Sequence, residues 1–160
     1  MIEMIASFDI GEVNFAYCIG TVNEIKILKF HNIKKKKTQT VLESCDIISS
    51  ILLKEDFTIC DKVIIEQQIV KNIRAQRIAQ HIWTWFKIKF PELNPEFVSA
   101  RIKTIRSLTY KQRKQYAVDY FKKILIERGD KVNLEYLTSL PKQDDVADCY
   151  IQLCEYSKRI

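Results

Sequence analysis

Glycine and proline are scarce in this 160-residue sequence, which contains three of each. So few glycines leave little room for a glycine-rich phosphate loop, and the low count of both residues leaves little room for long flexible linkers. With 47% hydrophobic residues, the chain is long enough for one domain with a substantial core and short for two. We therefore expect residues 1–160 to form a single domain.

The usual cysteine and histidine patterns are also missing. The five cysteines are odd in number and no two form a Cys-x-x-Cys pair, which argues against a disulfide framework and a zinc ribbon. The two histidines are too few and too isolated for a histidine-based metal site. No window approaches the roughly 18 apolar residues of a membrane span, and no basic N-terminal segment with a cleavage site is present. We expect an intracellular protein with reduced, mostly buried thiols and no membrane partner.

Positive charge is abundant instead. The 26 Lys and Arg residues against 20 Asp and Glu give a net charge of +6, which favours a polyanionic partner but is also found in ordinary cationic proteins. The run of lysines Lys34–Lys37 is typical of a solvated loop. A localisation signal and a position beside nucleic acid are the alternatives for this run.

The apolar pattern predicts an α/β fold. We expect strands in the runs that start at Ile5, Val13, Glu24, Lys62 and Glu96, the last one extending to Ile102. The first three form an antiparallel meander, with a turn at Gly20–Asn23. Helices are expected at Thr40–Lys54, Asn72–Phe90 and Tyr110–Arg128, and a last one follows Pro141. The apolar residues of the Asn72–Phe90 helix cover more than one stripe, so its second face either contacts a partner or is buried within the chain.

Acidic residues stand against this apolar background in three places. Asp9 and Glu66 end buried strands, where a helix-capping role is not available. Asp145 and Asp148 are three residues apart at the start of the last helix and share one face, whereas Asp144 most resembles an N-cap. A buried carboxylate requires a cation or hydrogen bonds, and oxygen donors of this kind are the ligands that magnesium and manganese prefer. Asp9, Glu66, Asp145 and Asp148 are therefore the candidate metal ligands.

Basic residues crowd the starts of two predicted helices, where cations oppose the helix dipole and so suggest another use. We expect them to contact the phosphates of nucleic acid. They are Arg74, Arg77, Lys111, Arg113 and Lys114.

Three motifs in this order are specific when taken together. They are Ser7-Phe-Asp-Ile-Gly with Asn14 and Ala16-Tyr, Ile64-Ile-Glu-Gln-Gln with Arg74, and Lys142-Gln-Asp-Asp-Val-Ala-Asp. Over nearly its whole length, the sequence resembles the RuvC-like Holliday junction resolvases of the ribonuclease H-like superfamily, and within them the poxvirus and mitochondrial branch. The resemblance implies a ribonuclease H-like α/β fold, with a mixed five-stranded sheet of three antiparallel strands and βαβ additions, flanked by helices.

The resemblance also implies an activity. Asp9, Glu66, Asp145 and Asp148 would be metal-binding catalytic acids, and either Lys111 or Lys114 would be the basic residue of the catalytic site. A homodimer would hold two Mg²⁺ ions per active site, with Mn²⁺ as a substitute and no small-molecule cofactor. It would cut four-way and other branched DNA by paired nicks during viral recombination and concatemer processing, in the host cytoplasm and virion. Because the Asn72–Phe90 helix has more apolar surface than one sheet-facing stripe requires, we expect the two-fold contact there; this surface comprises Ile78, Ile82, Trp83, Trp85, Phe86 and Phe90.

Other functions fit the sequence less well. An actin-like ATP-binding fold needs more glycines than Gly11, Gly20 and Gly129 provide. A non-catalytic DNA-binding module would gain nothing from acids that repel phosphate. A ribonuclease H-like nuclease acting on RNA–DNA hybrids stays open, because its metal site would be the same and strand geometry selects the substrate.

Overall fold

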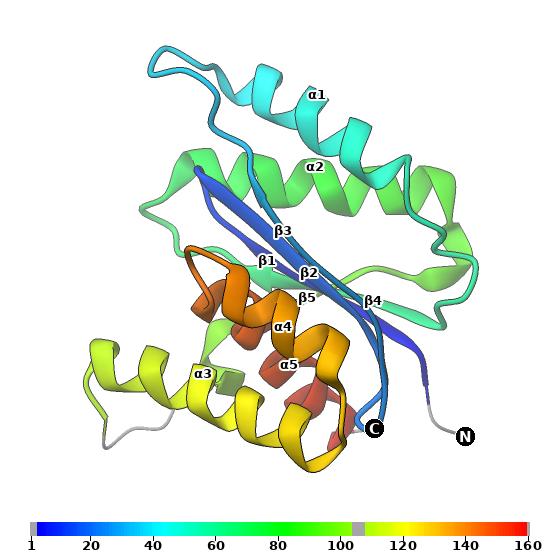
Figure 1. Ribbon diagram of the computed structural model, residues 1–160. Helices are drawn as coiled ribbons and strands as arrows, with labels where there is room; N and C mark the ends of the chain where they lie inside the picture. Colours follow the sequence, from blue (N-terminus) through cyan, green and yellow to red (C-terminus); the bar gives the residue numbers. More distant parts are fainter. Residues whose placement is uncertain (1–2, 104–107, 160) are drawn as a thin grey trace.

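In the computed structural model, which describes residues 3–103 and 108–159, five strands form a mixed sheet with helices on both faces (Figure 1). The strands are β1 (Ile5–Ile10), β2 (Asn14–Gly20), β3 (Ile25–Asn32), β4 (Lys62–Gln67) and β5 (Glu96–Ser99). Their spatial order is β3-β2-β1-β4-β5. The pairs β1–β2 and β2–β3 are antiparallel, whereas β4 lies parallel to β1 and β5 parallel to β4. The predicted meander with βαβ additions is therefore confirmed.

Two hydrophobic cores lie on opposite faces of the sheet. The helices are α1 (Val41–Leu52), α2 (Ile73–Lys89), α3 (Tyr110–Glu127), α4 (Lys131–Ser139) and α5 (Asp144–Ser157). Phe8 of β1 lies in the core beneath α1 and α2, whereas Ile5 lies in the core formed with α3, α4 and α5. Because side chains alternate along a strand, Asp9 faces the same side as Ile5. The acid predicted in β1 thus points toward the layer that contains α5.

The starts of α1 and α2 follow from the side chains that precede them. Thr40 caps α1 in a capping box with Glu43, and the Asn72 side chain accepts a hydrogen bond from the backbone of Ala75. Such caps satisfy backbone N–H groups that lack a partner in the first turn. Both helices begin within one residue of the predicted position.

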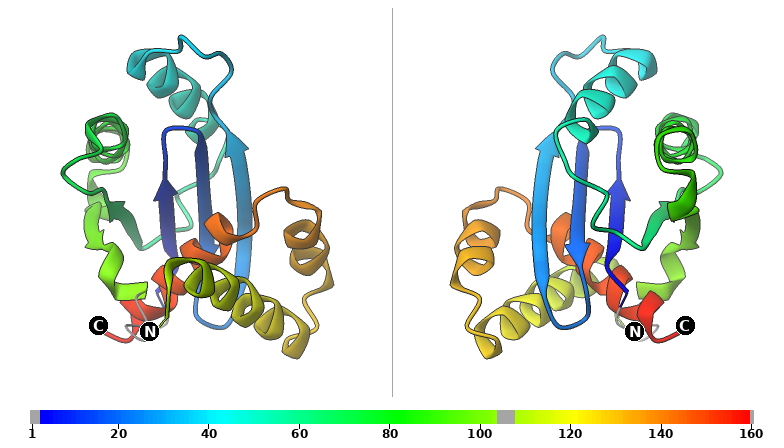
Figure 2. Two further views of the ribbon diagram at one scale, coloured as in Figure 1. Left: turned by 90° about the vertical axis from the view of Figure 1, so that its left-hand side faces the viewer. Right: turned by 90° about the vertical axis from the view of Figure 1, so that its right-hand side faces the viewer.

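The aromatic residues of α2 are largely used within the chain. The indole N–H of Trp83 donates a 2.9 Å hydrogen bond to the carbonyl of Pro95. Trp85 packs edge-on against Phe57 and Phe86, with ring centroids 6.1 and 5.0 Å apart. Both indoles are half-buried, and α1 packs beside α2 on this side of the sheet (Figure 2). Part of the aromatic surface that suggested a two-fold contact on this helix is therefore covered within the chain, whereas the two-fold contact itself stays a prediction.

Two other expectations are corrected. The strand expected to reach Ile102 ends at Ser99, and a 3₁₀ helix covers Ala100–Lys103. The helix α4 was not predicted, although Asp130 caps it by accepting a hydrogen bond from the backbone of Asn133.

Cys18, Cys45, Cys60 and Cys149 are buried, as expected, whereas Cys154 is partly exposed. Across the described residues, each helix is too short or too polar to cross a membrane.

Candidate active site

Asp9 and Glu66 lie at the ends of two neighbouring parallel strands. In the register of β1 with β4, Phe8 is opposite Ile65, so each carboxylate is the next residue on its strand. Ile64 lies in the core that contains α5, and side-chain alternation turns Glu66 toward the same face. The carboxyl ends of parallel strands are where α/β proteins commonly bind ligands. The structure thus brings these two predicted acids together at the carboxyl ends of β1 and β4.

Helix α5 supplies the other two acids. It packs against β1 and β2, and Asp145 near its start is only 7% exposed. Asp148 follows three residues later and shares a helical face with Asp145. The four carboxylates predicted from the sequence line a single cavity of about 750 Å³; they are Asp9, Glu66, Asp145 and Asp148.

Lys142 is a cation of this site that the sequence analysis did not single out. Its Nζ lies 2.8 and 3.0 Å from the two carboxylate oxygens of Asp145, and its side chain lines the cavity. Burial raises the pKa of the Asp145 carboxyl, and the nearby charge of Asp9 adds to that rise, which Lys142 opposes without cancelling. A lysine three residues before a buried acid at a helix start was the available signal.

Asp144 is an ion-pair partner and not the N-cap that the sequence suggested. The N-cap position is Gln143, which makes no side-chain capping bond, and α5 begins at Asp144. The Asp144 carboxylate accepts a hydrogen bond from Lys114 of α3. Burial favours a higher pKa for Asp144, but the ammonium groups of Lys114 and Lys142 hold the pKa below its usual value. The Asp144–Lys114 pair ties α3 to α5 beside the cavity.

The two candidate lysines of α3 differ in position. Lys114 lines the cavity, whereas Lys111 is exposed and does not. Burial lowers the pKa of Lys114, but the charges of Asp144 and Asp148 outweigh burial and hold the pKa above its ordinary value. Lys114 is therefore a fixed positive charge next to the acids, and the geometry favours it over Lys111.

The predicted arginines differ in their position relative to the cavity. Arg113 lines the cavity, whereas Arg74 and Arg77 lie outside it in the first turns of α2. The Arg74 guanidinium donates to the carbonyl of Gln39 at 2.8 Å and pairs with Glu12 at 3.1 Å. Arg77 is exposed one turn further along.

An aromatic wall on α3 was also missed. Tyr110, Tyr116 and Tyr120 line the cavity and are 67%, 47% and 37% exposed. The rings of Tyr116 and Tyr120 stack with their centroids 6.1 Å apart. The four-residue spacing of these two tyrosines on the polar side of a helix is the signal that could have found them.

The donor chemistry of the cavity fits a divalent cation. The carboxylates offer hard oxygen ligands, which suit Mg²⁺ and Mn²⁺. Burial is the main cause of the raised pKa of Asp145, and the negative charge of Asp9 adds to it, a repulsion that a cation would relieve. Among the described residues, no three His, Cys, Asp or Glu side chains are arranged to hold an ion.

Solved structures support the fold. Thermus thermophilus RuvC matches with a TM-score of 0.58 and 12% identity, over 98% of this chain and 96% of RuvC. T. thermophilus RuvC in complex with a Holliday junction substrate matches with a TM-score of 0.56 and 10% identity, over the same shares of both chains. At these identities the likeness concerns the fold, which is the predicted ribonuclease H-like one.

Relatives by sequence are viral. The chain is 26% identical to uncharacterized protein 97L of Invertebrate iridescent virus 3, over 97% of this chain and 100% of the relative. It is also 26% identical to uncharacterized protein 170L of Invertebrate iridescent virus 6, over 95% of this chain and 87% of the relative. The sequence profile of the family described as Poxvirus A22 protein matches residues 3–157. The chain therefore belongs to the poxvirus A22 protein family.

Proposed function

We propose that this protein is a Holliday junction resolvase, an endodeoxyribonuclease that hydrolyses phosphodiester bonds in four-way and other branched DNA. The observation that carries the proposal is the convergence of four carboxylates on one cavity of a RuvC-like fold, in a member of the poxvirus A22 protein family. These acids come from elements far apart in the sequence. They become neighbours only in the folded protein.

The carboxylates suit metal-assisted hydrolysis. Asp9, Glu66, Asp145 and Asp148 would hold two Mg²⁺ ions, with Mn²⁺ as a substitute, and the bound ions would activate water and neutralise the leaving oxygen. Lys114 would place its ammonium next to the scissile phosphate and oppose the negative charge that develops there. Its raised pKa keeps it protonated at neutral pH. Lys142 would hold Asp145 in place through its two short contacts.

Basic residues around the cavity would grip the DNA. Arg113 and Lys114 lie in the cavity wall, and Lys111 is exposed in the same helical segment. Arg74 and Arg77 stand at the start of α2, next to the strand that carries Glu66. Contacts of this kind fix the position of a duplex and carry no sequence information.

A homodimer would complete the function. A four-way junction presents two equivalent strands, and symmetric resolution needs two active sites related by a two-fold axis. This chain contains one set of acids. In a virus, such an enzyme would process recombination intermediates and replication concatemers in the host cytoplasm, and it would be carried in the virion.

Comparing substrates tests the proposal. We expect the wild-type protein with Mg²⁺ to cut a four-way junction by paired nicks and to leave a linear duplex of the same sequence intact. The Asp9→Asn variant serves as the inactive control. Preferential cutting of an RNA–DNA hybrid would instead assign a ribonuclease activity to the same site. Junction binding without cutting, at every Mg²⁺ or Mn²⁺ concentration, would indicate a non-catalytic module.

A further inference from the structure

A loop of four consecutive lysines projects between β3 and α1. Lys34–Lys37, here called the lysine loop, are all exposed. In Figure 1 the loop lies on the left-hand side of the molecule, as do the β1–β2 turn and the start of α3, and the turn lies between the other two. None of these lysines lines the cavity described above.

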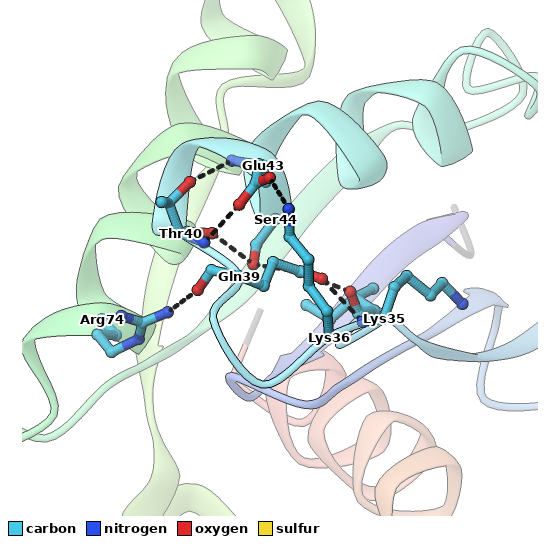
Figure 3. Close-up of polar contacts among 8 residues, drawn as sticks. Lys35, Lys36, Gln39, Thr40, Glu43, Ser44 and Arg74 are labelled. Carbon is cyan, nitrogen blue, oxygen red and sulfur yellow. Dashed lines mark hydrogen bonds and ion pairs between the residues drawn. The ribbon is translucent and has the colours of Figure 1, made fainter.

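A buried amide holds the lysine loop in one conformation. The side chain of Gln39 is 5% exposed, and its amide N–H group donates to the carbonyl of Ile33 at 2.7 Å and to the hydroxyl of Ser44 at 2.8 Å. Its carbonyl oxygen accepts from the backbone N–H of Lys35 at 2.8 Å (Figure 3). Adjacent like charges repel one another, so a charged loop of this kind tends to be disordered. Here the fold fixes it.

Little of the loop's charge is neutralised. Lys36 pairs with Glu43, at 2.6 Å, and the Lys35 ammonium donates to the carbonyl of Asn32. Within the described part of the chain, neither Lys34 nor Lys37 has a carboxylate partner. Four ammonium groups thus face one carboxylate, which leaves a concentrated positive surface.

The lysine loop is fastened to the rim of the cavity. The backbone N–H of Ile33 donates to the carbonyl of Val13 at 2.8 Å, and Val13 lines the cavity. Arg74 bridges the two parts, because its guanidinium binds both the carbonyl of Gln39 and the carboxylate of Glu12, another residue of the cavity lining. The loop and the rim therefore form one hydrogen-bonded unit.

We propose that the lysine loop binds the phosphate backbone of a duplex arm that extends from the cavity. The inference rests on the proposed function, and it adds a contact surface outside the active site. Duplex DNA carries one negative charge per roughly 1.7 Å of its axis, so an arm crossing the rim presents several phosphates to four lysines on an anchored backbone. Lysine ammonium groups act as point charges, and the contact is independent of sequence.

The test uses a pair of variants with equal charge changes. Lys34→Gln/Lys37→Gln removes two loop charges and keeps the Lys36–Glu43 pair, so the fold is preserved. Lys89→Gln/Lys131→Gln removes two exposed charges from the end of α2 and the start of α4, away from the loop. Fluorescence anisotropy in EDTA measures the affinity for a four-way junction over a series of salt concentrations. Junctions with arms of about 10 and 20 base pairs compare one with two helical turns.

We expect the loop variant to bind the longer-armed junction more weakly, with a salt dependence shallower by up to about 1.8 in log–log slope for two lost contacts. The control variant should keep the wild-type slope, and the loop effect should shrink with the shorter arms. Equal slopes for the loop variant and the control at both arm lengths would overturn the proposal. If the loop variant binds more weakly than the wild type while the wild-type protein cuts no junction, the lysine contact would be supported and the catalytic assignment refuted.

Discussion

Asp145 shows how a single residue combines the opposing demands of this site. Its carboxylate is almost fully buried, lies near another acid, and is held by Lys142 at 2.8 Å. Burial of an unpaired charge would cost several kcal/mol. The ammonium of Lys142 lowers that cost, and a divalent cation would lower it further. We therefore expect a divalent cation bound beside Asp145 to stabilise the charged form of its carboxylate.

Removing a single carboxylate oxygen from the site tests the metal assignment. We expect Asp9→Asn, Glu66→Gln, Asp145→Asn and Asp148→Asn each to abolish junction cleavage, because an amide is a poor ligand for Mg²⁺. DNA binding should persist or tighten, since each change removes a charge that repels phosphate. Parallel gel-shift and cleavage assays on one junction separate the two effects. Normal cleavage by both single variants, Asp9→Asn and Glu66→Gln, would refute the assignment.

The Asp144–Lys114 pair gives a prediction that depends on pH. Asp144 has a lowered pKa, so its contribution to stability is present above its unfolded pKa and is lost as pH falls through the folded value. Lys114 has a raised pKa, so its contribution is present below its unfolded pKa and is lost as pH rises through the folded value. We expect Asp144→Asn to lose about 1–3 kcal/mol of unfolding free energy, mainly between roughly pH 4 and 10.

Urea unfolding of this variant at several pH values measures the window, with Glu135→Gln on the exposed surface of α4 as the control. The control should stay within about 0.5 kcal/mol of the wild type at each pH. A loss in Asp144→Asn that persists unchanged at pH 2 would mean that the ion pair is not its cause.

Among the elements, those with a strong local pattern could be predicted from the sequence. A carboxylate inside an apolar strand has few uses, so Asp9 and Glu66 were identified with their strands. The role of Asp144 could not be predicted, because it depends on how α3 packs against α5, and Lys114 is 30 residues away. Helix α4 has nine residues, too few for a full apolar stripe, and it is stabilised by tertiary contacts such as that of Tyr136 with the backbone of Phe30.

Helix α2 provides a prediction about packing. Trp85 contacts Phe57 and Phe86 in the first core, so truncating it removes apolar contacts within the chain. We expect Trp85→Ala to lower the unfolding free energy by about 1–3 kcal/mol, less than for a fully buried tryptophan. The sedimentation coefficient should not change. Ile88→Ser, at a position 73% exposed on the same helix, should change stability by less than about 0.5 kcal/mol. Dissociation of an oligomer by Trp85→Ala without loss of stability would instead support the two-fold contact on α2.

At the scale of the whole molecule, the sheet has a structural core on one face and the candidate active site on the other. One face, with α1 and α2, holds a core rich in aromatic rings. The other face carries the acids of β1, β4 and α5, and α3 contributes Arg113, Lys114 and the three tyrosines to the cavity lining. The two layers meet at the β1–β2 turn, where Arg74 of α2 binds Glu12. A duplex held at this edge would therefore contact residues from both layers.

Paired cutting tests whether two such molecules act together. A junction has two equivalent strands, so a dimer can cut both in one encounter, whereas independent monomers would cut them in separate events. We expect the wild-type protein to linearise a supercoiled plasmid that carries a cruciform, because paired nicks sever both strands. The wild-type protein and Asp9→Asn, mixed under conditions that allow subunit exchange, should form dimers with one competent site. Linear product should then fall as the square of the wild-type fraction, while nicked circles accumulate. A linear dependence on that fraction, with sedimentation as a monomer on junction DNA, would rule out the dimer.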